Sequence, residues 1–167
     1  MKKLIMIGGT MGVGKTTLCQ ALKKELNHCV FLDGDWCWDM HPFVVNDETK
    51  AMVMDNICYV LNNDIHCHEY QNILFCWVMH KQSIIDELLS RLDTRDCEVY
   101  AISLVCSAST LKKQIKSDIN KGIRTQDVLQ RSLDRLDMYT HLNTILLDKT
   151  DLSMEETIIK IKQIIGE

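Results

Sequence analysis

A glycine-rich segment near the start of the sequence carries the residue types that bind phosphate groups. Residues Gly9 to Thr16 read GTMGVGKT and match the pattern GxxxxGK[ST]. Its glycines let the backbone wrap closely around an anion and point several N–H groups at it. In such a loop the lysine reaches the β- and γ-phosphates of a nucleoside triphosphate, and the hydroxyl after it ligates magnesium. The pattern predicts a site for ATP and Mg²⁺, in which Lys15 contacts the phosphates and Thr16 the metal.

The position of this segment supports the prediction. It follows a short apolar run and precedes an amphipathic stretch, so it would join a strand to a helix whose amino end also favours an anion. An accidental glycine-rich turn would not need that context. The residues expected to bind the nucleotide are Gly9, Thr10, Met11, Gly12, Val13, Gly14, Lys15, Thr16 and Thr17.

Two carboxylates follow the second apolar run, in the sequence LDGDW. At the carboxyl edge of a parallel sheet, Asp33 and Asp35 would lie beside the phosphate loop, where a phosphoryl acceptor must arrive in line. One carboxylate can accept the proton of an attacking hydroxyl, and the other can hold a water of the magnesium ion. We favour Asp35 as the base and Asp33 as the metal support, although the reverse assignment stays open. An Asp- and Gly-rich turn that enters a helix would explain the same residues structurally.

Short apolar runs alternate with amphipathic stretches along the chain. The runs predict five buried parallel strands, at Lys3–Ile7, Cys29–Leu32, Asn72–Val78, Val99–Val105 and Thr144–Leu147. The amphipathic stretches predict helices at Lys15–Asn27, Glu48–Asn62 or somewhat beyond, Lys81–Leu92, Thr110–Lys121, Gln126–Tyr139 and Met154–Ile165. Ser153 and Glu156 form a capping box for the last helix. This alternation indicates an α/β fold with a doubly wound sheet and a ligand site at the carboxyl ends of its strands.

Length and composition predict one domain over residues 1–167. The chain is 46% hydrophobic and carries a mild net charge of −4 with mixed signs, which argues against nucleic acid and anionic lipid as partners. The first apolar run is too short for a signal peptide or a membrane span. The eight cysteines are scattered and contain no CxxC pair, so we interpret them as reduced. We expect a cytoplasmic protein, monomeric or homodimeric.

Taken together, these motifs resemble the small P-loop kinases, which include gluconate kinase, shikimate kinase, adenylyl-sulfate kinase and chloramphenicol phosphotransferase. The resemblance spans nearly the whole chain and rests on GTMGVGKT, LDGD, the Ile123–Arg124 region and the terminal LLDKTDLSMEE. It implies a three-layer P-loop NTPase fold, with a five-stranded parallel sheet of order 2-3-1-4-5, helices on both faces and a small lid at about residues 118–130. It also implies transfer of the γ-phosphate of ATP, with magnesium, to a hydroxyl of a small molecule, nucleoside or nucleotide.

The resemblance also implies residues beyond the phosphate loop. In that family the lid supplies arginines, for which Arg124 is the best candidate here, and the loop after the last strand, here Asp148–Asp151, cups the adenine. Arg131 and Arg135, one helical turn apart, are weaker candidates. They are equally explained by a solvated helix face that pairs with neighbouring aspartates. We therefore include Arg124 and Arg131 among the ATP-binding residues, and Lys15, Asp35 and Arg124 as the catalytic set.

The chain departs from the family pattern on the acceptor side. The third predicted strand ends without an acidic residue, so support for magnesium would fall to Asp33 or to water. The residues after LDGD read WCWDMHPF, which prevents transfer of a sugar-acid specificity and leaves the acceptor open. Trp36, Trp38, His41 and Phe43 could form an aromatic wall for a planar acceptor, or they could pack as ordinary core. His80 could contact the acceptor or satisfy the start of the next helix.

Two other functions use the same phosphate loop. A nucleotide-binding regulatory ATPase or switch protein needs a residue that positions a hydrolytic water near the third strand, and the empty acidic position there argues against it. A GTPase would carry an NKxD motif, which the sequence lacks. A kinase of nucleic-acid ends would need a basic groove, which the acidic balance does not indicate.

Overall fold

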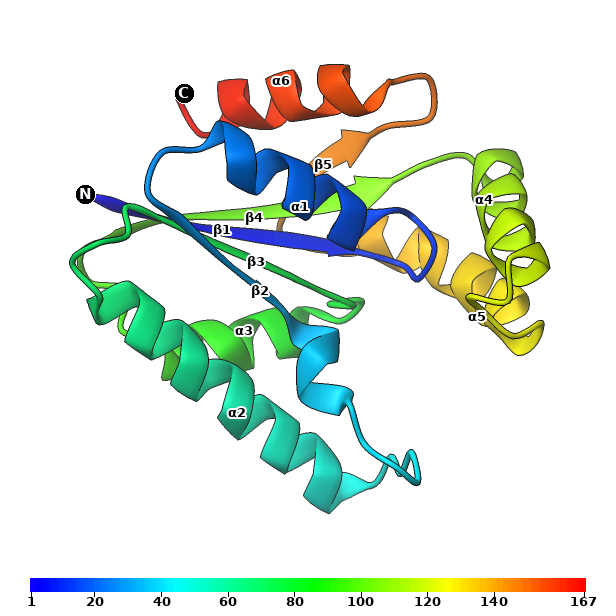
Figure 1. The fold of residues 1–167 in the computed structure, drawn as a ribbon, viewed down its shortest axis with the longest axis horizontal. Helices are drawn as coiled ribbons and strands as arrows, with labels where there is room; N and C mark the ends of the chain where they lie inside the picture. The colour runs from blue at the N-terminus through cyan, green and yellow to red at the C-terminus, as the bar shows by residue number, and fades with distance from the viewer.

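A five-stranded parallel sheet forms the centre of the computed structural model, which describes all of residues 1–167 (Figure 1). Its strands stand in the order β2-β3-β1-β4-β5, so the predicted fold and strand order are confirmed. The strands are β1 (Lys2–Gly9), β2 (Cys29–Asp33), β3 (Asn72–Trp77), β4 (Cys97–Val105) and β5 (Ile145–Asp148). Each strand lies within a few residues of its predicted range, because apolar runs of this length are typical of strands buried on both faces.

Helices cover both faces of the sheet. Figure 1 shows α1 and α6 on one face and α2 and α3 on the other, with α4 and α5 beyond the carboxyl ends of the strands. The α-helices are α1 (Lys15–Glu25), α2 (Asp47–His66), α3 (Gln82–Arg91), α4 (Ala108–Asn120), α5 (Asp127–Leu136) and α6 (Met154–Ile164). Two short 3-10 helices, η1 (Gly34–Trp38) and η2 (Asp137–His141), complete the chain. No helix is both long and apolar enough to cross a lipid bilayer.

The central strand β1 explains why the core has two halves. Its side chains alternate between the faces, as strand geometry requires. Ile5 and Ile7 belong to the apolar cluster under α1 and α6, whereas Leu4 and Met6 belong to the cluster under α2 and α3. All four are fully buried. This arrangement fixes β1 rigidly, and β1 leads directly into the glycine-rich segment.

The register of the strands brings the chemically interesting residues to one edge. Asp33 at the end of β2 lies opposite Cys76 of β3, and Gly8 of β1 lies opposite Trp77. The ends of β2, β3 and β1 are therefore nearly level, because parallel neighbours in register end together. The glycine-rich segment after β1 and the carboxylates after β2 consequently meet at the same edge.

Helix ends follow local chemistry. Ser153 and Glu156 form the predicted capping box at the start of α6. A second capping box, formed by Asn46 and Thr49, starts α2. The helix predicted over residues 126–139 divides into α5 and η2, and η2 brings Tyr139 under the sheet, where it is only 1% exposed. The eight cysteines are all free.

Candidate active site

The glycine-rich segment forms a loop between β1 and α1 whose shape depends on two glycines. Gly12 and Gly14 have φ angles of 81° and 97°, in the left-handed region that side chains disfavour. A Cβ on Gly12 would also lie 2.5 Å from Ile115 Cγ1 of α4. Gly14 is the N-cap of α1, and no side chain caps that helix end. The first N–H groups of α1 are therefore available to an anion.

Lys15 lies buried at the start of α1. The residue is only 8% exposed, and its Nζ donates a hydrogen bond to the carbonyl of Thr10 at 3.1 Å. Burial lowers the pKa of Lys15, while the charges of Asp35 and Asp33 act in the opposite direction. The ammonium group forms no ion pair within the loop. A phosphate group that arrives here would therefore meet a desolvated cation, for which an anionic partner is worth most.

Thr16 and Asp33 bring two oxygen ligands together. The Thr16 hydroxyl donates to Asp33 Oδ2 at 2.5 Å, and Asp33 Oδ1 accepts the N–H of Asp35 at 3.0 Å. Asp33 is only 3% exposed. A hydroxyl and a carboxylate are the hard oxygen donors that Mg²⁺ prefers, so this pair fits the ion that the sequence predicted. The residue opposite Asp33 on β3 is Cys76, so this strand supplies no carboxylate for the ion.

Asp35 lies on η1, one residue beyond the tight turn at Gly34. A Cβ on Gly34 would lie 2.6 Å from the Trp77 ring, so only glycine lets η1 pack this closely against β3. Asp35 is exposed to the cavity that it lines, and the protein around its carboxyl group removes part of its hydration. This desolvation, followed by the charge of Asp33, raises the pKa of Asp35, while Lys15 and Arg124 oppose the shift. A carboxylate of raised pKa is a stronger base than an ordinary surface aspartate.

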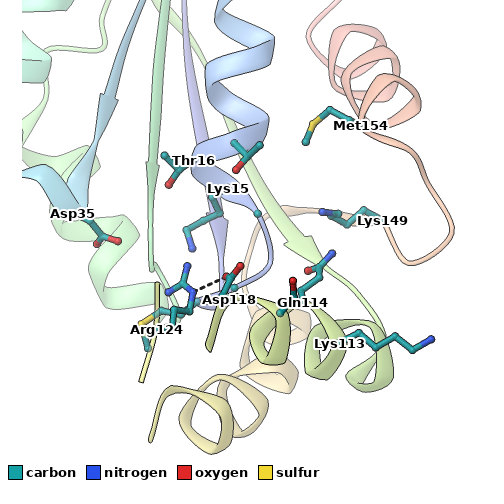
Figure 2. A pocket seen from close by; sticks show the side chains of 14 residues that line it. Lys15, Thr16, Asp35, Lys113, Gln114, Asp118, Arg124, Lys149 and Met154 are labelled. Carbon is teal, nitrogen blue, oxygen red and sulfur yellow. Dashed lines mark hydrogen bonds and ion pairs between the residues drawn. The ribbon is translucent and has the colours of Figure 1, made fainter. Parts of the chain in front are cut away.

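Lys15, Thr16 and Asp35 line one cavity of about 500 Å³ at the carboxyl edge of the sheet, whereas Asp33 lies outside its lining (Figure 2). That volume falls within the ordinary range for pockets that hold small ligands. The phosphate loop and α1 form its floor, η1 one side, α4 and the turn after it the opposite wall, and the loop before α6 the far end. The lining residues are Met11, Gly12, Gly14, Lys15, Thr16, Thr17, Asp35, Lys113, Gln114, Ser117, Asp118, Arg124, Lys149 and Met154.

Of the arginines predicted to reach this site, the structure brings Arg124 into the cavity. Its Nε donates to Asp118 Oδ2 at 3.0 Å, and both side chains are about one-third exposed. Arg131 lies outside the cavity lining and pairs with Asp127 at 3.1 Å, one helical turn away. Arg135 lies outside the lining as well. Of the three arginines, Arg124 is therefore the one placed to act with Lys15 on a shared anion.

Comparison with known protein families matches residues 5–137 to the AAA domain. The chain belongs to this AAA domain family. No curated protein matches its sequence. Among solved structures it resembles the tunicamycin resistance protein of Deinococcus radiodurans, at 16% identity and a TM-score of 0.73 over 99% of this chain and 96% of that one.

Two kinases share the fold of this AAA domain. A gluconokinase of Sinorhizobium meliloti 1021 is 15% identical, with a TM-score of 0.67 over 99% of this chain and 95% of that one. A shikimate kinase of Bacteroides thetaiotaomicron is 16% identical, with a TM-score of 0.64 over 99% of each chain. The resemblance to small P-loop kinases that the sequence indicated is thus confirmed at the level of the fold.

The aromatic residues after Asp35 do not form a single wall in this AAA domain. Trp36 is half-exposed and packs edge-on against Phe31, which belongs to the core under α1 and α6. Trp38 packs against Phe43 and against the core under α2 and α3. The two indoles therefore point to opposite faces of the sheet, and neither lines the cavity.

His80 also lies outside the cavity lining. Its Nδ1 is buried without a hydrogen-bond partner, and burial, followed by the charge of Arg135, lowers the pKa of its imidazole. The ring is therefore neutral over a wider pH range than a free histidine. Trp36, Trp38 and His80 stay predictions as acceptor contacts, and an acceptor would have to extend past Asp35 to reach them.

Six lining residues were not among the predicted site residues: Lys113, Gln114, Ser117, Asp118, Lys149 and Met154. The first four recur at helical spacing on α4, so they share one face of that helix. The sequence does not show that this face of α4 packs beside the phosphate loop, because that depends on how α4 is oriented in the fold. Lys149 belongs to the segment that the family resemblance had placed near the adenine, and its charge was the signal that could have drawn attention to it.

Proposed function

We propose that this protein is an ATP- and magnesium-dependent kinase that transfers the γ-phosphate to a hydroxyl of a small molecule, nucleoside or nucleotide. One observation carries the proposal: Asp35 and Arg124 line the same cavity as Lys15 and Thr16 of the phosphate loop. A nucleotide-binding loop alone would need only the last two. A base and a second cation beside the phosphates are what phosphoryl transfer to a hydroxyl adds.

The phosphates of ATP would bind in the loop from Gly9 to Thr17, against the free N–H groups at the start of α1. Lys15 would exchange its bond to the Thr10 carbonyl for the β- and γ-phosphates. Thr16 and Asp33 would hold Mg²⁺, which when bound would help to neutralise the charge of the phosphates. The adenine end would extend toward the far end of the cavity.

The reaction itself would use Asp35, Lys15 and Arg124. Asp35 accepts the proton of the acceptor hydroxyl, and the acceptor oxygen forms a bond to the γ-phosphorus. The bond from that phosphorus to the oxygen shared with the β-phosphate breaks, and the electron pair leaves with ADP. Lys15 and Arg124 stabilise the charge that spreads over the transferring phosphoryl group. Closure of the lid at residues 118–130 would bring Arg124 onto that group and exclude water.

A panel assay tests the proposal. ADP release from ATP is measured with nucleosides, sugars, sugar acids and aminocyclitols, and the wild type is compared with Asp35→Asn. Asp39→Asn is the matched control, because Asp39 is an exposed carboxylate just after η1 and outside the cavity. We expect one class of acceptor to raise ADP release in the wild type and in Asp39→Asn but not in Asp35→Asn. If no acceptor raises ADP release and Asp35→Asn equals the wild type, the regulatory ATPase becomes the better interpretation.

A further inference from the structure

Lys149 connects the far end of the cavity to the phosphate loop. It lies in the loop between β5 and α6, and its Nζ donates to the carbonyl of Val13 at 2.9 Å. A Cβ on Gly14 would lie 3.2 Å from the same Nζ. Figure 2 shows the side chain extending from its loop toward the phosphate loop. No carboxylate forms an ion pair with Lys149, so its positive charge is available to the cavity.

The loop that carries Lys149 is braced against the neighbouring strand. The Lys149 N–H donates to the carbonyl of Val105 at 2.9 Å, and the Thr150 hydroxyl accepts the N–H of Ser107 at 2.8 Å. Asp148 Oδ1 accepts both the N–H and the hydroxyl of Thr150, at 2.9 and 2.6 Å. These bonds set the start of the Lys149 side chain relative to β4 and to the start of α4. An ammonium group that contacts Val13 from such a support holds the loop in place.

The hydrogen bond from Lys149 to the Val13 carbonyl also orients the peptide group between Val13 and Gly14. In a trans peptide, the carbonyl of one residue and the N–H of the next point in opposite directions. When Lys149 holds the Val13 carbonyl on its own side, the N–H of Gly14 is turned to the other side. Gly14 has a left-handed φ and no side chain, so its conformation needs such an external restraint more than that of an ordinary residue.

We propose that Lys149 is a positioning residue of the phosphate loop. It fixes the peptide between Val13 and Gly14 so that the Gly14 N–H faces bound phosphates, and its charge adds to that of Lys15 from the opposite end of the cavity. The proposal rests on the proposed nucleotide function. It concerns the diphosphate or triphosphate group and not the base, so free pyrophosphate should experience the same effect as ATP.

Titration calorimetry with Mg-ATP and with magnesium pyrophosphate tests the proposal. Lys149→Met removes both charge and donor, Lys149→Gln keeps a donor without the charge, and Lys149→Arg keeps both. A charge-assisted hydrogen bond of this kind is worth enough that we expect Lys149→Met to weaken both ligands by about tenfold or more. Lys149→Arg should recover most of this loss, and Lys149→Gln should lie between them. Lys112→Met is the control, because Lys112 is exposed on α4 and outside the cavity, and it should bind both ligands like the wild type.

The outcomes separate the two proposals. If Lys149→Met keeps the melting temperature and binds pyrophosphate as tightly as the wild type, the positioning role is wrong. Loss of ATP affinity with unchanged pyrophosphate affinity would also overturn it, because Lys149 would then serve the base. If Lys149→Met fails to fold, the comparison of Lys149→Gln with Lys149→Arg tests the proposal instead. Equal affinities of these two variants for pyrophosphate would contradict a contribution from the charge of Lys149. A wild type that binds neither ligand overturns the proposed function itself, and the role of Lys149 with it.

Discussion

Arg124 Nε donates to Asp118 Oδ2 at 3.0 Å inside the cavity that contains Lys15. The bond uses the inner nitrogen of the guanidinium and leaves its two terminal nitrogens without a protein partner. Asp118 thus holds Arg124 at the cavity wall with its two terminal nitrogens free. The pair joins the end of α4 to the turn before α5, so it also ties together the segment that we propose as the lid.

This pair predicts different effects for its two members. Arg124→Met should lower kcat by about a hundredfold or more, because a cation that stabilises the transferring phosphoryl group is lost. Asp118→Asn should lower kcat by roughly tenfold, since Arg124 remains but is less well oriented, a smaller loss than that of a charge stabiliser itself. The KM for ATP should not rise in Asp118→Asn, because a negative charge leaves the cavity. Steady-state kinetics measures both constants. A raised KM with unchanged kcat in Asp118→Asn would contradict the orienting role.

Asp35 predicts an acid limb in the pH profile. Because its pKa lies above the ordinary aspartate value, we expect kcat/KM to fall as the pH drops through that raised pKa, where the base becomes protonated. Asp35→Asn should lower kcat/KM by about 10²–10⁴-fold and should remove the limb. Initial rates between weakly acid and neutral pH check this. An unchanged acid limb in Asp35→Asn would assign the titration to another group.

The same residue predicts a change in stability. A raised pKa means that the folded state binds the proton of Asp35 more tightly than the unfolded state does. The free energy of unfolding therefore decreases as the pH rises through the interval between the two pKa values. Asp35→Asn should be more stable than the wild type at neutral pH, and this advantage should shrink at acid pH. Urea unfolding at the two pH values measures the difference. A variant that is less stable than the wild type at neutral pH would count against the raised pKa.

Gly12 predicts a structural requirement of the phosphate loop. Gly12→Ala would place a Cβ 2.5 Å from Ile115 Cγ1 at a φ of 81°, so both a clash and backbone strain oppose it. We expect a loss of roughly 1–3 kcal/mol in the free energy of unfolding and much weaker nucleotide binding.

Gly166→Ala is the matched control for Gly12→Ala. Gly166 has a φ of 71°, but a Cβ there meets nothing within 4 Å. Gly166→Ala should lower the free energy of unfolding only by the backbone strain of about 1–2 kcal/mol, and it should leave nucleotide binding intact. If both variants lost the same stability and kept nucleotide binding, the clash with α4 would have no role.

The strands and most of the helices could be predicted because each had a clear local cause, and the strand order followed from the resemblance to the small P-loop kinases. β1 is an apolar run buried on both faces, and α6 starts at the Ser153–Glu156 capping box. The phosphate loop and the two carboxylates could be predicted for a similar reason. Their residue types and their positions after strands are visible in the sequence, and parallel strands bring such positions to one edge.

The rest of the site depends on packing that no local pattern shows. The cavity wall on α4 depends on which face of that helix turns toward the loop, and the contact between Lys149 and Val13 joins residues far apart in the chain. An aromatic wall that includes Trp36 and Trp38 was one of two interpretations that the sequence left open, because these residues are close in sequence. A 3-10 helix has three residues per turn, so residues two apart point about 120° away from each other.

The central claim is that the cavity transfers a phosphoryl group from ATP to an acceptor hydroxyl. The most direct measurement follows a label in the γ-phosphate of ATP in the presence of the acceptor that raises ADP release. We predict that the label appears in a phosphorylated organic product in the wild type, and that Lys15→Ala and Asp35→Asn abolish this product. Label found only in inorganic phosphate, with or without acceptor, would contradict the claim.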